Sequence, residues 1–294
     1  MPENDTSDSV QATGLPAVLL LHDHGAWFAA GKEKLVSPQA IEEAEHGKRT
    51  VVCAPQLKEQ IIDRFYAGAY LADTLASLGY VVLCVDALYW GERAVSLPDA
   101  QADDKALKEY NSTLKDYQPS FYSVCLKKYG KAWYEKVLAD DKACVTYLLS
   151  LPCVDKARIA CFGFSFGAYR SWQLAAEDNR IAVCAAANWM TTKKANGGPL
   201  PNVSAYSMFR PAVPYQTDYP DIASLIAPRP FLLVYGTHDR LFSLAATQEC
   251  AVRIAEAYKK SDSETLFRAA AFDEDHCFGA AQRKALTDFL KDNL

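Results

Sequence analysis

One short segment carries a serine in the setting that nucleophilic catalysis needs. The sequence GFSFG, residues 163–167, follows the apolar run RIACF and opens the amphipathic run AYRSWQLAA. This order predicts a strand, a sharp turn and a helix, with the Ser165 hydroxyl exposed at the end of a sheet. The two glycines leave room for the strand and the helix to approach, and the backbone N–H of Phe166 can point at a developing oxyanion. The pattern predicts nucleophilic attack by Ser165.

A serine hydroxyl is a weak nucleophile, so it needs a base and a group that orients the base. Of the five histidines, only His238 and His276 follow Ser165. In the strand–turn–helix arrangement the chain order is serine, acid, histidine. Asp239 follows the apolar run FLLVYG and His276 follows the last predicted strand, so we expect Asp239 to orient His276 and His238 to lie in a turn. The rival acids share the loop of His276: Asp273, Glu274 and Asp275.

A second segment, LLLHDHGAWF at residues 19–28, presents a different chemistry. His22 and His24 lie two residues apart, so both rings could face one side of a strand and bind a metal, as in amidohydrolase barrels. That function requires a barrel of about eight strands, and it leaves GFSFG unexplained. We instead expect the loop to form the second wall of an oxyanion hole, with the N–H of His24 as the first choice of donor and that of Ala26 as the second.

Short apolar runs alternate with longer amphipathic runs, which is the pattern of βα units around a parallel sheet. Most of these short runs are apolar on both faces, as a sheet covered by helices on both sides requires. The sequence therefore predicts an α/β fold with a mostly parallel sheet of about six main strands. Strands are expected at 16–22, 80–86, 157–164, 180–187, 229–236 and 265–272, and helices at about 56–78, 131–150, 166–178, 243–260 and 279–293, with a short helix ended by Pro228.

We expect a disordered tail over residues 1–15 and a single domain over residues 16–294. Three segments are longer than usual connections and leave the carboxyl ends of strands, where open α/β sheets bind ligands. These insertions, at about 29–55, 91–130 and 188–220, are expected to form a substrate pocket or a lid. Aromatic side chains there would suit stacking on a sugar ring or an aromatic acyl group. The predicted pocket residues are Trp27, Phe28, Tyr89, Trp90, Arg93 and Trp189.

The composition limits the partners and the compartment. The chain has 294 residues, 50% of them hydrophobic, and a net charge of −5, which fits one large globular domain. Charges of both signs are interspersed, so neither a nucleic acid nor an anionic membrane is expected as a partner. Nine irregularly spaced cysteines do not suggest a disulfide framework. We expect a cytoplasmic protein, or a periplasmic or secreted one if a signal peptide has been removed.

The catalytic segments resemble those of the α/β-hydrolase superfamily. GFSFGAYRSW and the loops of Asp239 and His276 carry this resemblance, and LHDHGAWFAAGKEKLV, DALYWGER and LIAPRPFLLVYGTHD narrow it. They are similar to the dienelactone-hydrolase-like and acetyl-xylan-esterase-like branches, from about residue 16 onward. The resemblance implies a serine carboxylesterase without a metal or an organic cofactor, acting on short-chain or acetyl esters of carbohydrates or small molecules.

The sequence differs from the family pattern at two places, and two other functions are compatible with it. Dienelactone hydrolases proper use a cysteine at the position of Ser165, which favours the esterase branch. Only about fifteen polar residues precede LLLH, so the strands that usually lie at this edge of the sheet are expected to be truncated. The same triad could cleave amides, as in the prolyl oligopeptidase branch, or the domain could bind ligands without catalysis.

Overall fold

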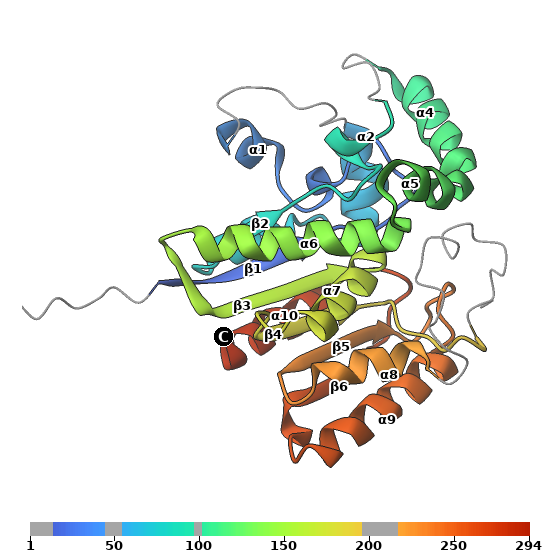
Figure 1. The fold of residues 1–294 in the computed structure, drawn as a ribbon. Coiled ribbons are helices and arrows are strands. Elements are labelled where there is room, and N and C mark those ends of the chain that lie inside the picture. The colour runs from blue at the N-terminus through green and yellow to red at the C-terminus, as the bar shows by residue number, and fades with distance from the viewer. Residues whose placement is uncertain (1–13, 45–54, 97–101, 196–216) are drawn as a thin grey trace, which may run out of the picture.

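The structure is a computed structural model, and it describes residues 14–44, 55–96, 102–195 and 217–294 (Figure 1). Six strands in these residues form one sheet in the order β2-β1-β3-β4-β5-β6, and every neighbouring pair is parallel. The predicted α/β fold with a mostly parallel sheet is therefore confirmed. The strands are β1 (Leu15–Leu21), β2 (Val81–Cys84), β3 (Val154–Phe164), β4 (Val183–Ala187), β5 (Phe231–Gly236) and β6 (Phe267–Phe272).

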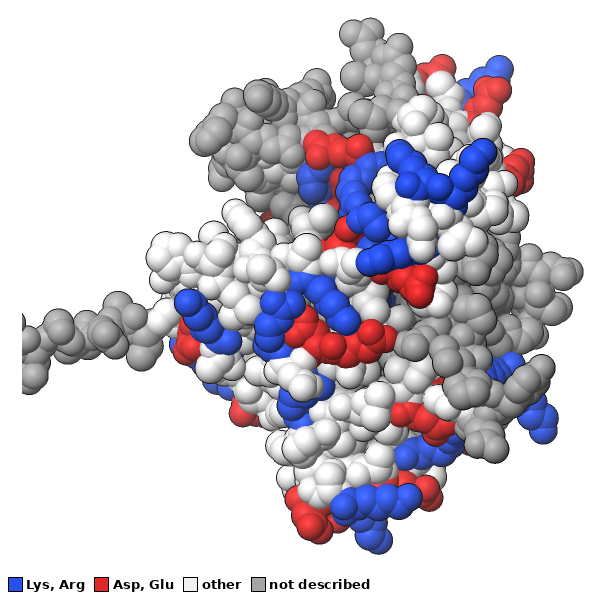
Figure 2. Space-filling model, in the orientation of Figure 1, with Lys and Arg blue, Asp and Glu red and all other residues white. Residues whose placement is uncertain are grey.

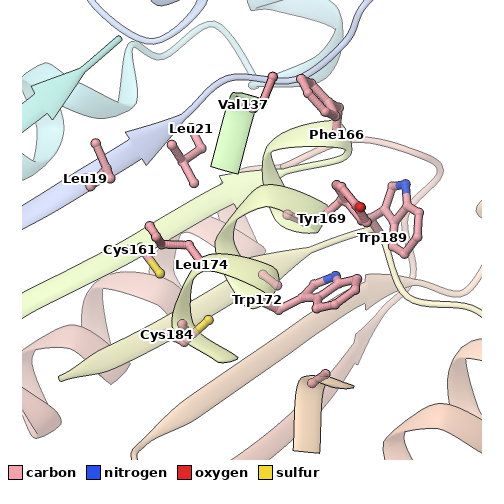
Figure 3. Packing of buried hydrophobic residues seen from close by; sticks show 14 of the residues in the cluster. Leu19, Leu21, Val137, Cys161, Phe166, Tyr169, Trp172, Leu174, Cys184 and Trp189 are labelled. Atoms are coloured by element: carbon pink, nitrogen blue, oxygen red, sulfur yellow. The ribbon is translucent and has the colours of Figure 1, made fainter. Parts of the chain in front are cut away.

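Helices cover both faces of the sheet because the central strands are apolar on both faces. In β1, Leu19 and Leu21 belong to one buried cluster, whereas Val18 and Leu20 belong to another. The first cluster lies under α6 (Trp133–Ser150), α7 (Phe166–Glu177), α8 (Tyr219–Ala223) and α9 (Leu244–Lys260), and the second under α3 (Leu71–Ser77) and α10 (Ala280–Asn293). Figure 3 shows Tyr169 and Trp172 of α7 packed among the residues of the first cluster.

The single helix predicted over residues 56–78 is in fact interrupted. A helical segment, α2 (Pro55–Leu57) with a π-helical turn (Lys58–Asp63), ends before Ala67 and Gly68, whose φ angles are 51° and 72°. The Gly68 N–H donates to the Ile62 carbonyl oxygen (3.0 Å). Such a left-handed exit terminates a helix, and α3 begins only at Leu71. Apolar residues continue at helical spacing across the break, which is why the sequence pattern predicted one helix instead of two.

Two of the three predicted insertions contain helices that lie on the β2 side of the sheet (Figure 1). The first holds a 3₁₀ turn (Lys32–Lys34) and α1 (Pro38–Ala44), and the second holds 3₁₀ turns (Gly91–Arg93, Gln118–Ser120), α4 (Asp104–Tyr117) and α5 (Phe121–Tyr129). Residues 45–54 and 97–101 of these insertions, residues 196–216 of the third, and residues 1–13 of the predicted tail lie outside the described residues. The helix predicted before Pro228 is α8, followed by a 3₁₀ turn (Ser224–Ile226).

The charged surface agrees with the composition. On the face shown in Figure 2, basic and acidic side chains lie intermixed, and neither sign forms a continuous stripe. Within the described part of the chain, no helix combines the length and the apolar character that crossing a bilayer requires.

Candidate active site

Ser165 lies on a sharp turn between β3 and α7. Its backbone has φ 54° and ψ −120°, a conformation that is strained for a residue with a side chain. A Cβ atom at Gly163 would lie 2.1 Å from the carbonyl carbon of Gly167, and a Cβ at Gly167 would lie 1.8 Å from the carbonyl oxygen of Leu21. Both positions therefore require glycine. The contact with Leu21 also places the end of β1 directly against the first turn of α7.

The structure brings together the three side chains expected from the sequence. His276 Nε2 lies 2.9 Å from Ser165 Oγ, and His276 Nδ1 lies 2.8 Å from Asp239 Oδ2. Ser165 follows β3, Asp239 follows β5 and His276 follows β6, so the parallel sheet presents all three at one edge. The carboxylate is almost fully buried and the imidazole is mostly buried, which strengthens the interaction between them.

His238 and two of the rival acids, Asp273 and Glu274, have hydrogen-bond partners other than His276. His238 Nε2 lies 2.6 Å from Asp273 Oδ1, and both side chains are largely exposed. Glu274 accepts a hydrogen bond from Gln282 Nε2 (2.8 Å). Asp239 Oδ1 accepts hydrogen bonds from two backbone N–H groups of its own loop, which fixes the carboxylate. Among the four acids considered, Asp239 is the one whose carboxylate contacts His276.

The ring nitrogens of His22 and His24 are already used in hydrogen bonds. His22 Nδ1 donates to the Asp23 carbonyl oxygen (2.8 Å), and its Nε2 accepts from the Ala87 N–H (2.9 Å). His24 Nδ1 accepts from the Ala26 N–H (2.9 Å), so its Nε2 donates to Gln118 Oε1 (3.1 Å). Burial lowers the pKa of His22 well below its usual value and that of His24 to about 4, so both rings are neutral.

The described residues favour neither a metal site at His22 and His24 nor the Ala26 N–H as an oxyanion donor. Three or more His, Cys, Asp or Glu residues arranged to hold a metal do not occur within the described ranges. The sheet is open and has six strands in those ranges, whereas an amidohydrolase needs a barrel. The Ala26 N–H, our second choice for the oxyanion, is committed to the His24 ring. The backbone N–H of His24 stays the first choice as a prediction.

A cavity of about 770 Å³ opens beside Ser165 and His276. Its apolar wall includes Phe65, Phe164, Phe166, Trp189, Leu241 and Phe242, and its charged lining residues include Arg64, Lys115, Arg240, Glu274 and Asp275. His24 and Gln118 also line it, so the insertion that follows β2 contributes to the site. The cavity beside the serine therefore has both an apolar wall and charged and polar lining groups.

Comparisons with known proteins place the chain in a family and identify structures with a similar fold. The model of the dienelactone hydrolase family matches residues 67–285, which is most of the chain. The chain belongs to the dienelactone hydrolase family. This family member is 26% identical over 281 residues to the "Putative hydrolase YtaP" of Bacillus subtilis (strain 168), a match that covers 94% of the chain and 78% of the relative.

Solved structures share the fold of this dienelactone hydrolase family member. A "putative acetyl xylan esterase" from Bacteroides fragilis NCTC 9343 has a TM-score of 0.60 at 18% identity; 90% of the present chain is covered, and it spans 60% of the length of that structure. A glucuronoyl esterase from Solibacter usitatus has a TM-score of 0.58 at 13% identity, covering 97% and 75% of the two chains. The chain is a hydrolase of the dienelactone hydrolase and esterase type.

In this family member, five of the six predicted pocket residues do not line the cavity. Trp90 is fully buried between the rings of Phe28 and Phe166, with centroid distances of 4.8 and 5.6 Å. Arg93 donates to Asp140 Oδ2 (2.5 Å) and is a structural ion-pair partner. Trp27 and Tyr89 are also buried in the core. Only Trp189 lines the cavity. Aromatic residues after a strand can point into the core as readily as into a pocket, which explains the wrong predictions.

One buried residue at the site was missed. Asn188 follows β4 with a φ of 56°. Its Oδ1 accepts from the Gly236 N–H at the end of β5 (2.7 Å), and its Nδ2 donates to the Cys277 carbonyl oxygen (2.6 Å). Asn188 thus ties the strand that precedes Asp239 to the loop that carries His276. The sequence offered one signal, an asparagine directly after an apolar strand, where it tolerates a left-handed backbone.

Proposed function

We propose that this chain is a serine carboxylesterase that acts through Ser165, His276 and Asp239. The observation that carries the proposal is the continuous pair of hydrogen bonds from Ser165 Oγ through both ring nitrogens of His276 to Asp239, at the wall of the cavity. A neutral imidazole whose Nδ1–H donates to Asp239 leaves Nε2 free to accept the serine proton.

The roles follow from this geometry. Ser165 Oγ attacks the ester carbonyl carbon as its proton passes to His276 Nε2, and the carbonyl electron pair moves onto oxygen. The N–H groups of Phe166 and His24 are proposed to bind this oxyanion, and Asp239 stabilises the imidazolium. The imidazolium then protonates the leaving alkoxide, and an acyl-enzyme remains. Water, deprotonated by His276, attacks the acyl group; collapse of this second tetrahedral intermediate releases the acid and returns the proton to Ser165.

The substrate class rests on the cavity and on the relatives. We propose short-chain or acetyl esters of carbohydrates or small molecules, bound against the apolar wall that contains Trp189. Apolar and aromatic walls with few polar groups are typical of small-molecule sites. The proposed reaction is consistent with the names of the acetyl xylan and glucuronoyl esterases that share the fold.

A panel of substrates on matched variants tests this function. We expect hydrolysis of p-nitrophenyl acetate in preference to butyryl and feruloyl esters, with acetylated xylan as the carbohydrate arm. Ser165→Ala should lower kcat by about 10⁴-fold or more, because removal of the nucleophile leaves only binding and oxyanion stabilisation. The control is the exposed Ser77→Ala in α3, which should retain full activity. Equal activity in Ser165→Ala would refute the assignment, and a preference for an aminoacyl-anilide would favour an amidase.

A further inference from the structure

A fully buried lysine lies beneath the proposed oxyanion loop, here defined as residues 22–26. The Lys34 side chain has no exposed surface, and its Nζ donates to the carbonyl oxygens of Asp23 (3.0 Å) and His24 (2.9 Å). The same Nζ lies 3.8 Å from Asp23 Oδ2. An ammonium has three N–H donors, and here it faces three acceptors. Removing an ammonium from water costs several kcal/mol even when it is paired, so stability alone does not account for a lysine at this position.

The two carbonyl groups that Lys34 holds determine where the next two N–H groups point. In a planar trans peptide the C=O and the following N–H point in opposite directions. Fixing the Asp23 carbonyl therefore fixes the His24 N–H, and fixing the His24 carbonyl fixes the Gly25 N–H. Each carbonyl also accepts a second hydrogen bond, from His22 Nδ1 (2.8 Å) and from Trp90 Nε1 (3.2 Å), respectively.

The oxyanion loop is pressed tightly against the ammonium. A Cβ atom at Gly25 would lie 3.3 Å from Lys34 Nζ and 2.5 Å from Asp23 Oδ2, and the backbone of Gly25 is left-handed (φ 57°). On its other side, the loop lines the cavity together with Ser165. The peptide planes of the oxyanion loop are thus held between a buried cation and the reaction site.

We propose that Lys34 is a positioning residue for catalysis, holding the Asp23 and His24 carbonyls so that the N–H groups on the opposite side of these peptides face the oxyanion. This inference rests on the proposed serine esterase function. The ammonium also polarises the peptides that it binds, which strengthens their N–H groups as donors. Asp23 balances the buried charge and in turn accepts from the Tyr66 hydroxyl (2.5 Å). Burial lowers the pKa of Lys34, whereas the Asp23 carboxylate opposes that shift.

The test is Lys34→Met, which keeps the length of the side chain and removes its donors. We expect kcat for p-nitrophenyl acetate to fall about 10²–10³-fold, as for loss of an oxyanion donor. KM should change by less than about threefold, since ground-state binding does not require the oxyanion donors. An aryl trifluoromethyl ketone, which forms a tetrahedral adduct with a reactive serine, should bind more weakly by a similar factor. The control for lost stability is Ile254→Ala in the core of α9, which should lower the melting temperature and leave kcat unchanged.

Two outcomes would overturn the inference without touching the proposed function. Ser165→Ala could be inactive while folded Lys34→Met keeps wild-type kcat and ketone affinity, or Lys34→Met could raise KM alone. If Lys34→Met does not fold, Trp90→Phe removes the indole donor to the His24 carbonyl and keeps an aromatic ring in the stack. In that case we expect kcat to fall about tenfold with KM unchanged, and wild-type kcat would refute the role of the held carbonyls. Activity that survives Ser165→Ala would instead refute the proposed function itself.

Discussion

At the scale of single residues, the two oxygens of Asp239 have separate partners. Oδ2 contacts His276 Nδ1, whereas Oδ1 accepts the N–H groups of Leu241 (2.7 Å) and Phe242 (3.1 Å). Holding the loop and orienting the imidazole are therefore tasks of different atoms. A substitution that changes only one oxygen can separate them.

Asp239→Asn is such a substitution. The amide oxygen can still accept both backbone N–H groups, so we expect the fold to be kept. The amide nitrogen would donate toward His276 Nδ1 and favour the tautomer that has its proton on Nε2, which cannot accept from Ser165. By analogy with other serine triads, kcat should fall about 10⁴-fold. Steady-state kinetics and circular dichroism measure the two effects. Asp273→Asn, in the exposed pair with His238, is the matched control and should remain active; a fully active Asp239→Asn would contradict the assigned role.

Residues that act through local context could be found from the sequence, whereas residues that act through distant contacts could not. Ser165 is marked by the strand, turn and helix around it, and Asp239 and His276 by the strand ends that precede them. Lys34 carries no such mark, and the strand end before Asn188 gives its place but not its partners, because the backbone groups that these two side chains bind reach them only in the folded chain. Trp90 was assigned to the pocket because its position after a strand was known but its direction was not.

At the scale of elements, one buried amide side chain joins α4 to the segment that directly follows the oxyanion loop. Asn111 Oδ1 accepts from the N–H groups of Phe28 (2.6 Å) and Ala29 (3.2 Å), and its Nδ2 donates to the Leu107 carbonyl oxygen (2.8 Å). The insertion after β2 thus supplies acceptors that the segment after β1 lacks. Next to this contact, Gln118 binds the His24 ring.

Asn111→Leu tests this connection. The leucine keeps a similar volume but leaves the N–H groups of Phe28 and Ala29 without their acceptor. Each buried donor that loses its partner costs roughly 1–3 kcal/mol, so we expect the unfolding free energy to fall by about 2–6 kcal/mol. Urea denaturation measures the change. Lys108→Ala, on the exposed side of α4, should alter stability by less than about 0.5 kcal/mol. An unchanged midpoint for Asn111→Leu would show that water replaces the amide.

The elements were predictable to the extent that apolar runs define them. All six strands were placed correctly in outline. The four central strands are largely buried and apolar on both faces, and the edge strands β2 and β6 are only partly buried but also consist mostly of apolar residues. The fourth was predicted to start at residue 180, but it starts at Val183, because the Ile181 N–H closes a turn onto Asp178. The order β2-β1-β3-β4-β5-β6 depends on pairing between distant segments, and the sequence supplied only its parallel character.

At the scale of the whole molecule, two buried neutral histidines link stability to pH. Burial lowers the pKa of His24 to about 4 and that of His22 well below its usual value, whereas both would titrate near 6.5 in the unfolded chain. Below pH 6.5 the unfolded state therefore binds more protons than the folded state. Each histidine contributes stability that is complete above pH 6.5 and is lost as the pH falls toward its folded value.

This linkage predicts that stability falls steeply in acid and that the contribution of one histidine can be measured by substituting it. His24 should contribute about 1.2 kcal/mol per pH unit to the slope of unfolding free energy between pH 6 and pH 5. His24→Gln removes one of the two groups, and glutamine can both accept from Ala26 and donate to Gln118, so the slope should fall by about that amount. Urea denaturation at several pH values measures it. His238→Gln, at an exposed side chain, should keep the wild-type slope. If His24→Gln also keeps that slope, His24 takes up its proton in the folded state, and the buried ring beside the oxyanion loop is not held neutral.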